Sequence, residues 1–251
     1  MGQYRDDGIV LRTQDLGEAD HIVTILTRRT GRIRAVGKGV RRTKSRFGAR
    51  LEPFTHVDLQ LHTGRSLDYV TQAETVRAYG EPLAADYPRY TSGTAMLETA
   101  ERFTPVEKEP SLRQFLLLVG GLRALGEGAH DPRLVLDAFL LRSLAVAGYA
   151  PALAECALCG AAGPATNGAG GGSRAFAIAA GGLTCQSCRP PGAATPSVHT
   201  IALMSALLRG DWAHADAAER RHQVECSGLV AAYLQWHLEH SIRSLQHVEH
   251  A

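Results

Sequence analysis

The stretch HVDLQLH, residues 56–62, alternates between apolar and polar side chains without a break. Val57, Leu59 and Leu61 point to one side of an extended chain, and the polar residues between them point to the other. Strict alternation of this kind predicts a β-strand with one buried side and one side in solvent. Such a strand needs partners, and the neighbouring sequence contains several candidates.

Four further short strands are expected near this one. They are GIVLRT (8–13), HIVTILT (21–27), RIRAVGK (32–38) and LDYVTQAETV (67–76). RRTG (28–31) and HTGR (62–65) contain the residues typical of turns. Five short strands in about 75 residues, with no long helix between them, suit a small closed barrel. The best-known barrel of that size is the five-stranded oligonucleotide-binding fold, or OB-fold, which we predict for residues 1–79.

From about residue 80 the hydrophobic pattern becomes helical. In DPRLVLDAFLLRSLAVAG (131–148), Asp131 is the expected N-cap, Pro132 the first helical residue and Gly148 the terminating glycine. Because this segment is apolar on nearly all sides, we expect a buried helix.

Two more helices are expected on either side of it. SLRQFLLLVGGLRAL (111–125) has Ser111 as its predicted cap. Its expected apolar face consists of Leu112, Phe115, Leu116, Val119 and Leu122. A second apolar stripe follows near the end of the sequence, formed by Leu229, Val230, Tyr233, Leu234, Leu238, Ile242 and Leu245. Cys226 lies on the same predicted helix and is expected to be a small buried hydrophobic residue.

Two C-x-x-C pairs lie between the helical stretches, Cys156 with Cys159 and Cys185 with Cys188. Two such pairs in one short segment predict one structural zinc ion, because four thiolates complete a tetrahedral zinc site. The 25 residues between the pairs exceed the usual spacing, and TNGAGGGS (166–173) is expected to be a flexible loop that accounts for the excess. The alternatives are redox-active cysteines, which need a strand-to-helix setting, and vestigial cysteines.

These patterns predict an α+β multi-domain protein. We expect an OB-fold domain over residues 1–79, followed by an all-helical domain over 80–155 and 191–251 that a zinc module at 156–190 interrupts. The start MGQYRDDGIV lacks the apolar core of a signal peptide, and apolar runs such as FLLLVGGL are too short to span a membrane. A cytoplasmic protein with reduced cysteines is therefore expected.

Positive charge is concentrated in one part of the chain. Residues 28–50 contain ten basic and no acidic side chains, whereas the rest of the chain has 17 basic and 25 acidic ones. This concentration predicts contacts with polynucleotide phosphates, and the alternative is a solvated basic surface. The predicted contact residues are Arg28, Arg29, Arg32, Arg34, Lys38, Arg41, Arg42, Lys44, Arg46 and Arg50. The loop 34–50 should carry the main contact, with Arg28, Arg29 and Arg32 extending it along the neighbouring hairpin.

The glycines around Lys38 raise a second possibility, a nucleotide-binding P-loop. A P-loop has two glycines separated by four residues, then Lys and a Ser or Thr that binds magnesium. Here five residues separate Gly31 from Gly37, and Gly39 follows Lys38 in place of the hydroxyl. The sequence therefore favours a polynucleotide over ATP.

No arrangement typical of an enzyme is apparent. Four cysteine ligands leave no open coordination position on zinc. HLEH (237–240) resembles the H-x-E of zinc deaminases, but it follows the cysteine pairs instead of preceding them. Glu18 and Asp20 are acidic neighbours in an expected turn and make a poor metal site. We predict a binding protein, not an enzyme.

The chain resembles the RecO family of bacterial recombination mediators and DNA-repair proteins. The resemblance is carried, in this order, by GIVLRTQDLGEADHIVTILT, GRIRAVGKGVRR, LEPFTHVDLQL, FLLRSLAVAGYAPAL and the CALCG and CQSC pairs. It implies an OB-fold followed by a helical domain that a zinc module interrupts. It further implies binding to single- and double-stranded DNA, annealing of complementary strands and joint action with RecR. Loading of RecA onto DNA coated by single-stranded-DNA-binding protein, at the nucleoid, is also implied.

The resemblance also implies a docking site on the helical domain for the acidic tail of single-stranded-DNA-binding protein. Arg142 is the expected contact, because a lone cation on an apolar helix needs a partner. An internal salt bridge with a carboxylate is the alternative. Since a fold alone does not fix a function, an RNA-binding or transcription-associated protein with a zinc ribbon is the second candidate function.

Aromatic residues are few in the basic segment. Sites that stack single strands use several aromatic side chains, whereas this segment has only Phe47, with Phe54 just beyond it. DNA binding is therefore expected to depend on phosphate contacts, without a strong preference for single strands.

Overall fold

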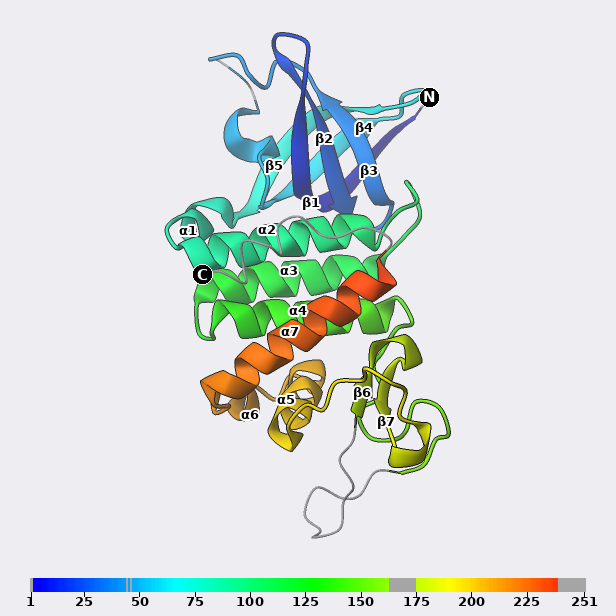
Figure 1. Ribbon diagram of the computed structural model, residues 1–251. Helices are drawn as coiled ribbons and strands as arrows, with labels where there is room; N and C mark the ends of the chain where they lie inside the picture. Colours follow the sequence, from blue (N-terminus) through cyan, green and yellow to red (C-terminus); the bar gives the residue numbers. More distant parts are fainter. Residues whose placement is uncertain (1, 44, 46, 163–174, 239–251) are drawn as a thin grey trace. The chain divides into compact units, whose positions relative to one another are not determined.

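The computed structural model describes residues 2–43, 45, 47–162 and 175–238. Figure 1 shows the helices and strands along the chain, which divides into two compact units. The first contains the described residues up to Pro132, and the second contains those from Arg133 onward.

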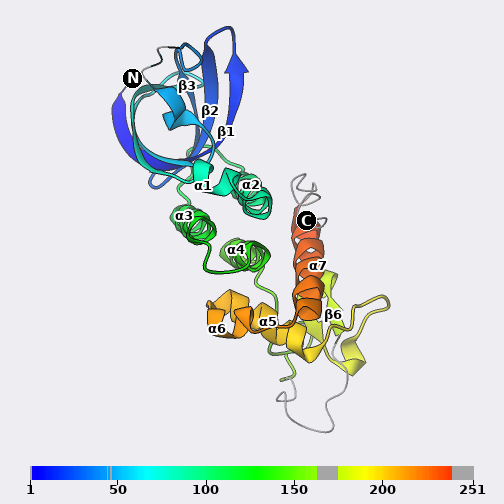
Figure 2. The same ribbon diagram turned by 90° about the vertical axis from the view of Figure 1, so that its left-hand side faces the viewer.

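The first unit begins with a closed barrel. Its strands are β1 (Gln3–Leu16), β2 (Asp20–Thr27), β3 (Gly31–Gly37), β4 (Thr55–His62) and β5 (Asp68–Ala78), with the short 3-10 helix η1 (Gly48–Leu51) before β4. They close in the order β1-β2-β3-β5-β4, and Figure 2 shows the ring. All neighbours are antiparallel except β3 and β5, which pair in parallel. The predicted five-stranded OB-fold is confirmed.

Alternating side chains fill the barrel, as the pattern in β4 predicts. Val57, Leu59 and Leu61 are fully buried, and the polar residues between them are partly exposed. Strand β1 pairs with β4 through its first half and with β2 through its second half. Gly8 lies where β1 pairs with both strands. A Cβ on Gly8 would lie 2.6 Å from the Ile25 side chain, so only glycine fits this close approach.

Three helices complete the first unit: α1 (Gly80–Ala84), α2 (Tyr87–Arg102) and α3 (Leu112–Glu127). Ser111 precedes α3, as predicted. The predicted apolar face is wrong at Leu112 and Leu116, which are 48% and 51% exposed. The buried stripe of α3 instead runs through Phe115, Leu118, Leu122 and Leu125.

The second unit is helical with a small hairpin. It contains α4 (Pro132–Val146), β6 (Ala175–Ala177), η2 (Ile178–Ala180), β7 (Gly182–Thr184), η3 (Gln186–Cys188), α5 (Val198–Arg209), α6 (Trp212–Asp216) and α7 (Arg220–His237). Helix α4 is buried on most sides, as predicted. The helix ends at Val146, and Gly148, two residues further on, adopts a φ of +90°. The Tyr149 N–H donates to Leu144 O and the Gly148 N–H donates to Ala145 O, the hydrogen-bond pattern of a glycine-terminated helix.

The described part of the C-terminal stripe is largely buried. Val230, Tyr233, Leu234 and Cys226 of α7 are buried, and burial raises the pKa of the Cys226 thiol. Cys226 is therefore the small buried residue that the sequence predicts. Ile242 and Leu245 lie outside the described residues. Among the described helices, none is both long and apolar enough to cross a membrane.

Candidate metal centre and nucleic-acid interface

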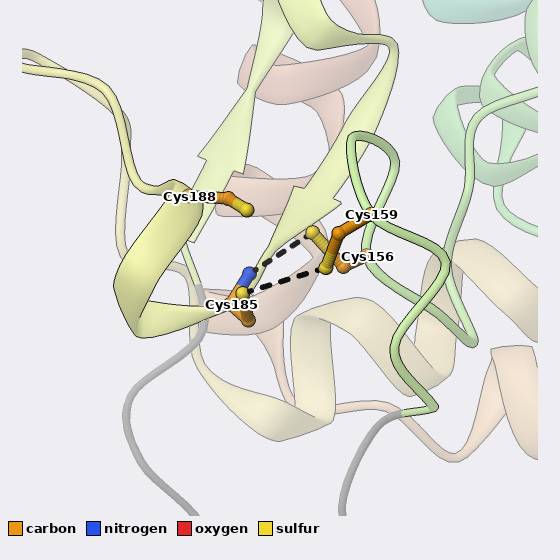
Figure 3. A group of neighbouring side chains, drawn as sticks. All are labelled: Cys156, Cys159, Cys185 and Cys188. Carbon is orange, nitrogen blue, oxygen red and sulfur yellow. Dashed lines mark hydrogen bonds between the residues drawn. The ribbon is translucent and has the colours of Figure 1, made fainter.

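The four cysteines of the two C-x-x-C pairs lie together in the second unit (Figure 3). Their sulfur atoms are all within 4.8 Å of one another, and Cys159 Sγ lies 3.8 Å from Cys185 Sγ. In a tetrahedron with zinc–sulfur distances of about 2.3 Å, two sulfurs lie about 3.8 Å apart. The cluster can therefore bind one metal ion, and a set of four sulfur donors suits zinc.

The backbone brings the two pairs together. The first pair turns tightly, because Gly160 N–H donates to Cys156 O at 2.8 Å and Gly160 adopts a φ of +71° that favours glycine. The second pair follows strand β7, and Ala157 N–H donates to Leu183 O of that strand at 2.7 Å. The β6–β7 hairpin thus places the second pair beside the first. The glycine-rich stretch 166–173 lies outside the described residues.

Local hydrogen bonds prepare one of the sulfurs for metal binding. The Cys185 N–H donates to Cys156 Sγ at 3.4 Å. Backbone N–H groups of Cys185, Cys159 and Leu158 lower the pKa of Cys156 to about 6, because they stabilise its thiolate. The neighbouring thiols, Cys185 first among them, raise the pKa of Cys188 to about 12. A bound cation would favour deprotonation of all four.

The basic residues of the segment 28–50 divide between the two ends of strand β3. Arg28 and Arg29 lie in the turn before β3, whereas Lys38, Arg41 and Arg42 follow it. Since β3 has seven residues, its two ends are about 20 Å apart. The two groups of basic residues are therefore separated along β3, and the DNA contact expected of Arg28, Arg29 and Arg32 stays a prediction.

Three connections meet at the end of the barrel that carries Lys38; we call residues 17–19, 38–43 and 63–67 the loop end. The Arg41 N–H donates to Ala19 O at 3.0 Å, and the Gly39 N–H donates to Asp20 Oδ1 at 2.7 Å. The 63–67 turn is adjacent because β5, which begins directly after it, pairs with the end of β3 through Tyr69 and Val36. Two of them, 17–19 and 63–67, are the β1–β2 and β4–β5 loops, through which OB-folds bind oligonucleotides, and 38–43 is the start of the β3–β4 connection beside them.

The loop end contains exposed cations. Lys38, Arg41, Arg42 and Arg65 are all exposed. Arg41 pairs with Asp15 at 3.0 Å, so part of its charge is compensated. Sequence reasoning missed Arg65, because it lies 15 residues beyond the basic segment, in the turn between β4 and β5. Arg50 is exposed in the connection before β4, while Lys44 and Arg46 lie outside the described residues.

Arg32 and Arg34 are covered by the connection between α2 and α3, residues 103–111, which we call the strap. Arg32 Nε donates to Thr104 O and its Nη2 to Pro105 O, both at 2.6 Å. Arg34 Nε donates to Glu107 Oε1 at 2.5 Å. Charges that are unopposed in the local sequence are thus opposed in space by carboxylates and carbonyls about 70 residues away.

Arg142 has an internal partner. Its Nε and Nη2 donate to Leu207 O at 3.0 and 2.7 Å. Leu207 lies in the last turn of α5, where backbone carbonyls lack partners within the helix. Arg142 therefore caps α5, and its internal partner is a carbonyl, not the carboxylate of the alternative interpretation. Burial lowers the pKa of Arg142.

The described part of HLEH is packed. The His237 ring stacks on Tyr149 with centroids 4.4 Å apart and meets Tyr233 edge-on at 4.6 Å. Burial lowers the pKa of His237. Glu239 and His240 lie outside the described residues.

The closed barrel, the helices and the four-thiol cluster together define an OB-fold protein with a cysteine cluster that could bind a metal ion. Comparison with known proteins covers nearly the whole chain. The family model "Recombination protein O N terminal" matches residues 1–79, and "Recombination protein O C terminal" matches residues 84–246.

Individual relatives match over their full length. The DNA repair protein RecO of Thermobifida fusca is 70% identical over 251 residues, covering 100% of both chains. That of Streptomyces griseus is 61% identical over 255 residues, covering 99% of this chain and 100% of its own. That of Frankia casuarinae is 56% identical over 251 residues, again covering 100% of both. The chain belongs to the RecO family, as its sequence resemblance indicates, and its role lies in DNA repair and recombination.

Proposed function

We propose that this protein is a recombination mediator that binds single- and double-stranded DNA through the loop end of its barrel. In this proposal it anneals complementary strands and helps RecA to load onto DNA coated by single-stranded-DNA-binding protein. The observation that carries the proposal is the group of exposed cations Lys38, Arg42 and Arg65 on two neighbouring connections of one barrel end. Membership of a DNA-repair family supports DNA as the polyanion.

Phosphate contacts explain why one surface can serve both strand forms. Lys38 and Arg42 can neutralise phosphates without reading base identity, so any sequence can bind. Two strands held against cations repel each other less, which favours pairing of complementary bases. Arg41 can join them when a phosphate competes with Asp15, an exposed pair that is easily exchanged.

The remaining chain is assigned supporting roles. We propose that residues 1–79 form the DNA-binding domain and that residues 80–155 and 191–251 form one helical domain. Cys156, Cys159, Cys185 and Cys188 would hold one structural zinc that joins the two halves of the module at 156–190. RecR and the acidic tail of single-stranded-DNA-binding protein are the proposed protein partners, at the nucleoid in the cytoplasm. Arg142 can bind the acidic tail only if its hydrogen bonds to Leu207 O break.

Strand annealing tests the proposal. Two complementary oligonucleotides, one carrying a fluorophore and the other a quencher, should pair faster with the wild-type protein than without it. The Lys38→Ala/Arg42→Ala variant should lose most of this acceleration, because it lacks two cations that meet phosphates. A protein that binds RNA in preference to DNA and accelerates no annealing would support the RNA-binding alternative. Hydrolysis of ATP or DNA in the same mixture would favour an enzyme.

The contact between the strap and Arg34 leads to a second prediction, about DNA affinity. Glu107→Gln removes the carboxylate that faces Arg34. The Arg34 side chain then becomes available to bind one more phosphate. We expect affinity for DNA to rise about fivefold at ~0.1 M salt, the effect of one added phosphate contact. Glu109→Gln is the matched control. It removes the same charge from an exposed side chain two residues after Glu107. Equal gains in both variants, measured by fluorescence anisotropy, would mean that only net charge matters.

A further inference from the structure

Tyr69 is an exposed aromatic side chain beside the loop end. It is 41% exposed, whereas Phe47 and Phe54, the aromatic residues in and next to the basic segment, are 1% and 6% exposed. Its neighbours Asp68 and Val70 on β5 are buried, so the strand turns the Tyr69 ring outward. The core gains little from an aromatic ring at this position.

The ring is held between two connections of the loop end. Lys38 Nζ lies 5.3 Å from the centre of the Tyr69 ring, a cation–π contact. On the other connection, a Cβ on Gly64 would lie 3.1 Å from Tyr69 Cε2 and only 1.9 Å from Leu67 O. Glycine at position 64 therefore allows the turn to fold tightly beside the ring.

The backbone that carries Tyr69 is fixed by its buried neighbour, Asp68. The Asp68 carboxylate accepts hydrogen bonds from Tyr4 OH at 2.6 Å, Lys108 Nζ at 2.9 Å and the Gly64 N–H at 3.2 Å. Burial raises the pKa of Asp68, but these three donors outweigh it and bring the pKa below its usual value. An ionised, fully bonded Asp68 anchors β5 to β1, the strap and the 63–67 turn. Tyr69 is therefore presented on a rigid strand.

We propose that Tyr69 stacks on an unpaired nucleobase while Lys38 moves from the ring to the adjacent phosphate. Every base offers a flat aromatic face, so such stacking tolerates any sequence. In a duplex those faces are occupied by neighbouring bases, and Tyr69 contributes little. The inference rests on the proposed function and deepens it, because it makes the single strand the preferred ligand of the loop end. It replaces the expectation, drawn from the basic segment alone, of no strong strand preference.

Three substitutions separate stacking from other roles of this side chain. Tyr69→Leu removes the aromatic face but keeps an apolar side chain of moderate size. Tyr69→Phe keeps the face and removes only the hydroxyl. Tyr87→Leu is the matched control, because Tyr87 is a more exposed tyrosine, 59%, at the start of α2.

The experiment compares binding of an oligo-dT strand and of a duplex with the same number of phosphates per strand. Tyr69→Leu should bind the single strand about five- to a hundredfold more weakly and the duplex within about twofold of wild type. Tyr69→Phe and Tyr87→Leu should match wild type for both. In a single strand carrying 2-aminopurine, fluorescence should be quenched by wild type and by Tyr69→Phe, and much less by Tyr69→Leu.

Two outcomes overturn the inference alone. One is an equal loss of single-strand and duplex affinity in Tyr69→Leu, and the other is unchanged affinity for both. In either case the wild-type protein still binds DNA, so the proposed function stands. Wild-type protein that binds neither form overturns the proposed function and the stacking inference together. Melting curves of each variant show whether it is folded. In a folded Tyr69→Phe variant, loss of 2-aminopurine quenching would also contradict stacking.

Discussion

Replacing Cys185 with serine is expected to release the metal and to unfold the module around it. Three thiolates and a hydroxyl bind zinc far more weakly than four thiolates do. The module has few large apolar residues of its own, and within its described parts, 156–162 and 175–190, Phe176 and Leu183 are the largest that are buried. Structural zinc contributes about 10–16 kcal/mol to folding in zinc-finger peptides. Its loss should therefore lower the unfolding temperature of the module more than any single core substitution.

Elemental analysis and thermal unfolding measure this effect. Wild-type protein purified without a chelator should contain about one zinc per chain, and Cys185→Ser close to none. Cys226→Ala is the control, because it removes a cysteine that is buried in α7 away from the cluster and should keep the zinc. Far less than one zinc per wild-type chain would contradict the metal assignment. DNA affinity should change little, since the cations assigned to DNA lie in the first unit.

The second large effect is expected from Lys38→Ala combined with Arg42→Ala. Removal of two cations that meet phosphates should weaken single-strand binding about 25-fold at ~0.1 M salt. The matched control is Arg28→Ala combined with Arg29→Ala, which removes the same charge at the opposite end of β3. This control variant should bind the single strand less than about threefold more weakly than wild type, because only the general attraction between protein and DNA is reduced.

Fluorescence anisotropy with a labelled oligonucleotide gives both values. Equal losses in the two double variants would show that binding follows net charge and not the loop end. A larger loss of affinity in the Arg28→Ala/Arg29→Ala variant would indicate that DNA binds at the other end of the barrel.

The barrel could be predicted from sequence because β4 alternates strictly and four neighbouring short segments have the composition of strands between turn residues. The first half of β1 could not, since QYRDD contains two adjacent acids and no apolar alternation. Asp6 is buried there because its carboxylate accepts hydrogen bonds from the Arg29 and Thr30 N–H groups and from the Thr30 hydroxyl. These partners lie more than twenty residues away, so no local pattern indicates them.

The buried face of α3 differs from the predicted one for another reason. Three successive leucines occupy positions 116–118, between Phe115 and Val119, so apolar residues lie on every side of the helix. Periodicity then fits more than one face, and the packing of Phe115 and Leu118 decides between them.

The two candidate sites differ in how far the sequence predicts them. Spacing alone identifies the cysteine cluster, since two C-x-x-C pairs in one short segment are a typical ligand set for one zinc. Charge alone identifies the basic segment but not the direction of its side chains, because Glu107 and Asp15 approach from other elements. Tyr69 and Arg65 lie outside the segment. The signal that could have found them is the OB-fold itself, whose β4–β5 loop shares an end with the β1–β2 loop.

The salt dependence of DNA binding tests the central claim most directly. If about five cations at and near the loop end meet phosphates, the logarithm of affinity should fall linearly with the logarithm of salt concentration. The expected slope is about −3.5 for single strands and about −4.5 for duplex. Lys38→Ala/Arg42→Ala should flatten it by about one to two units, because two of those cations are removed. ATP should not compete, since Gly39 replaces the magnesium-binding hydroxyl after Lys38. A slope near zero, or displacement of DNA by micromolar ATP, would contradict phosphate binding at the loop end.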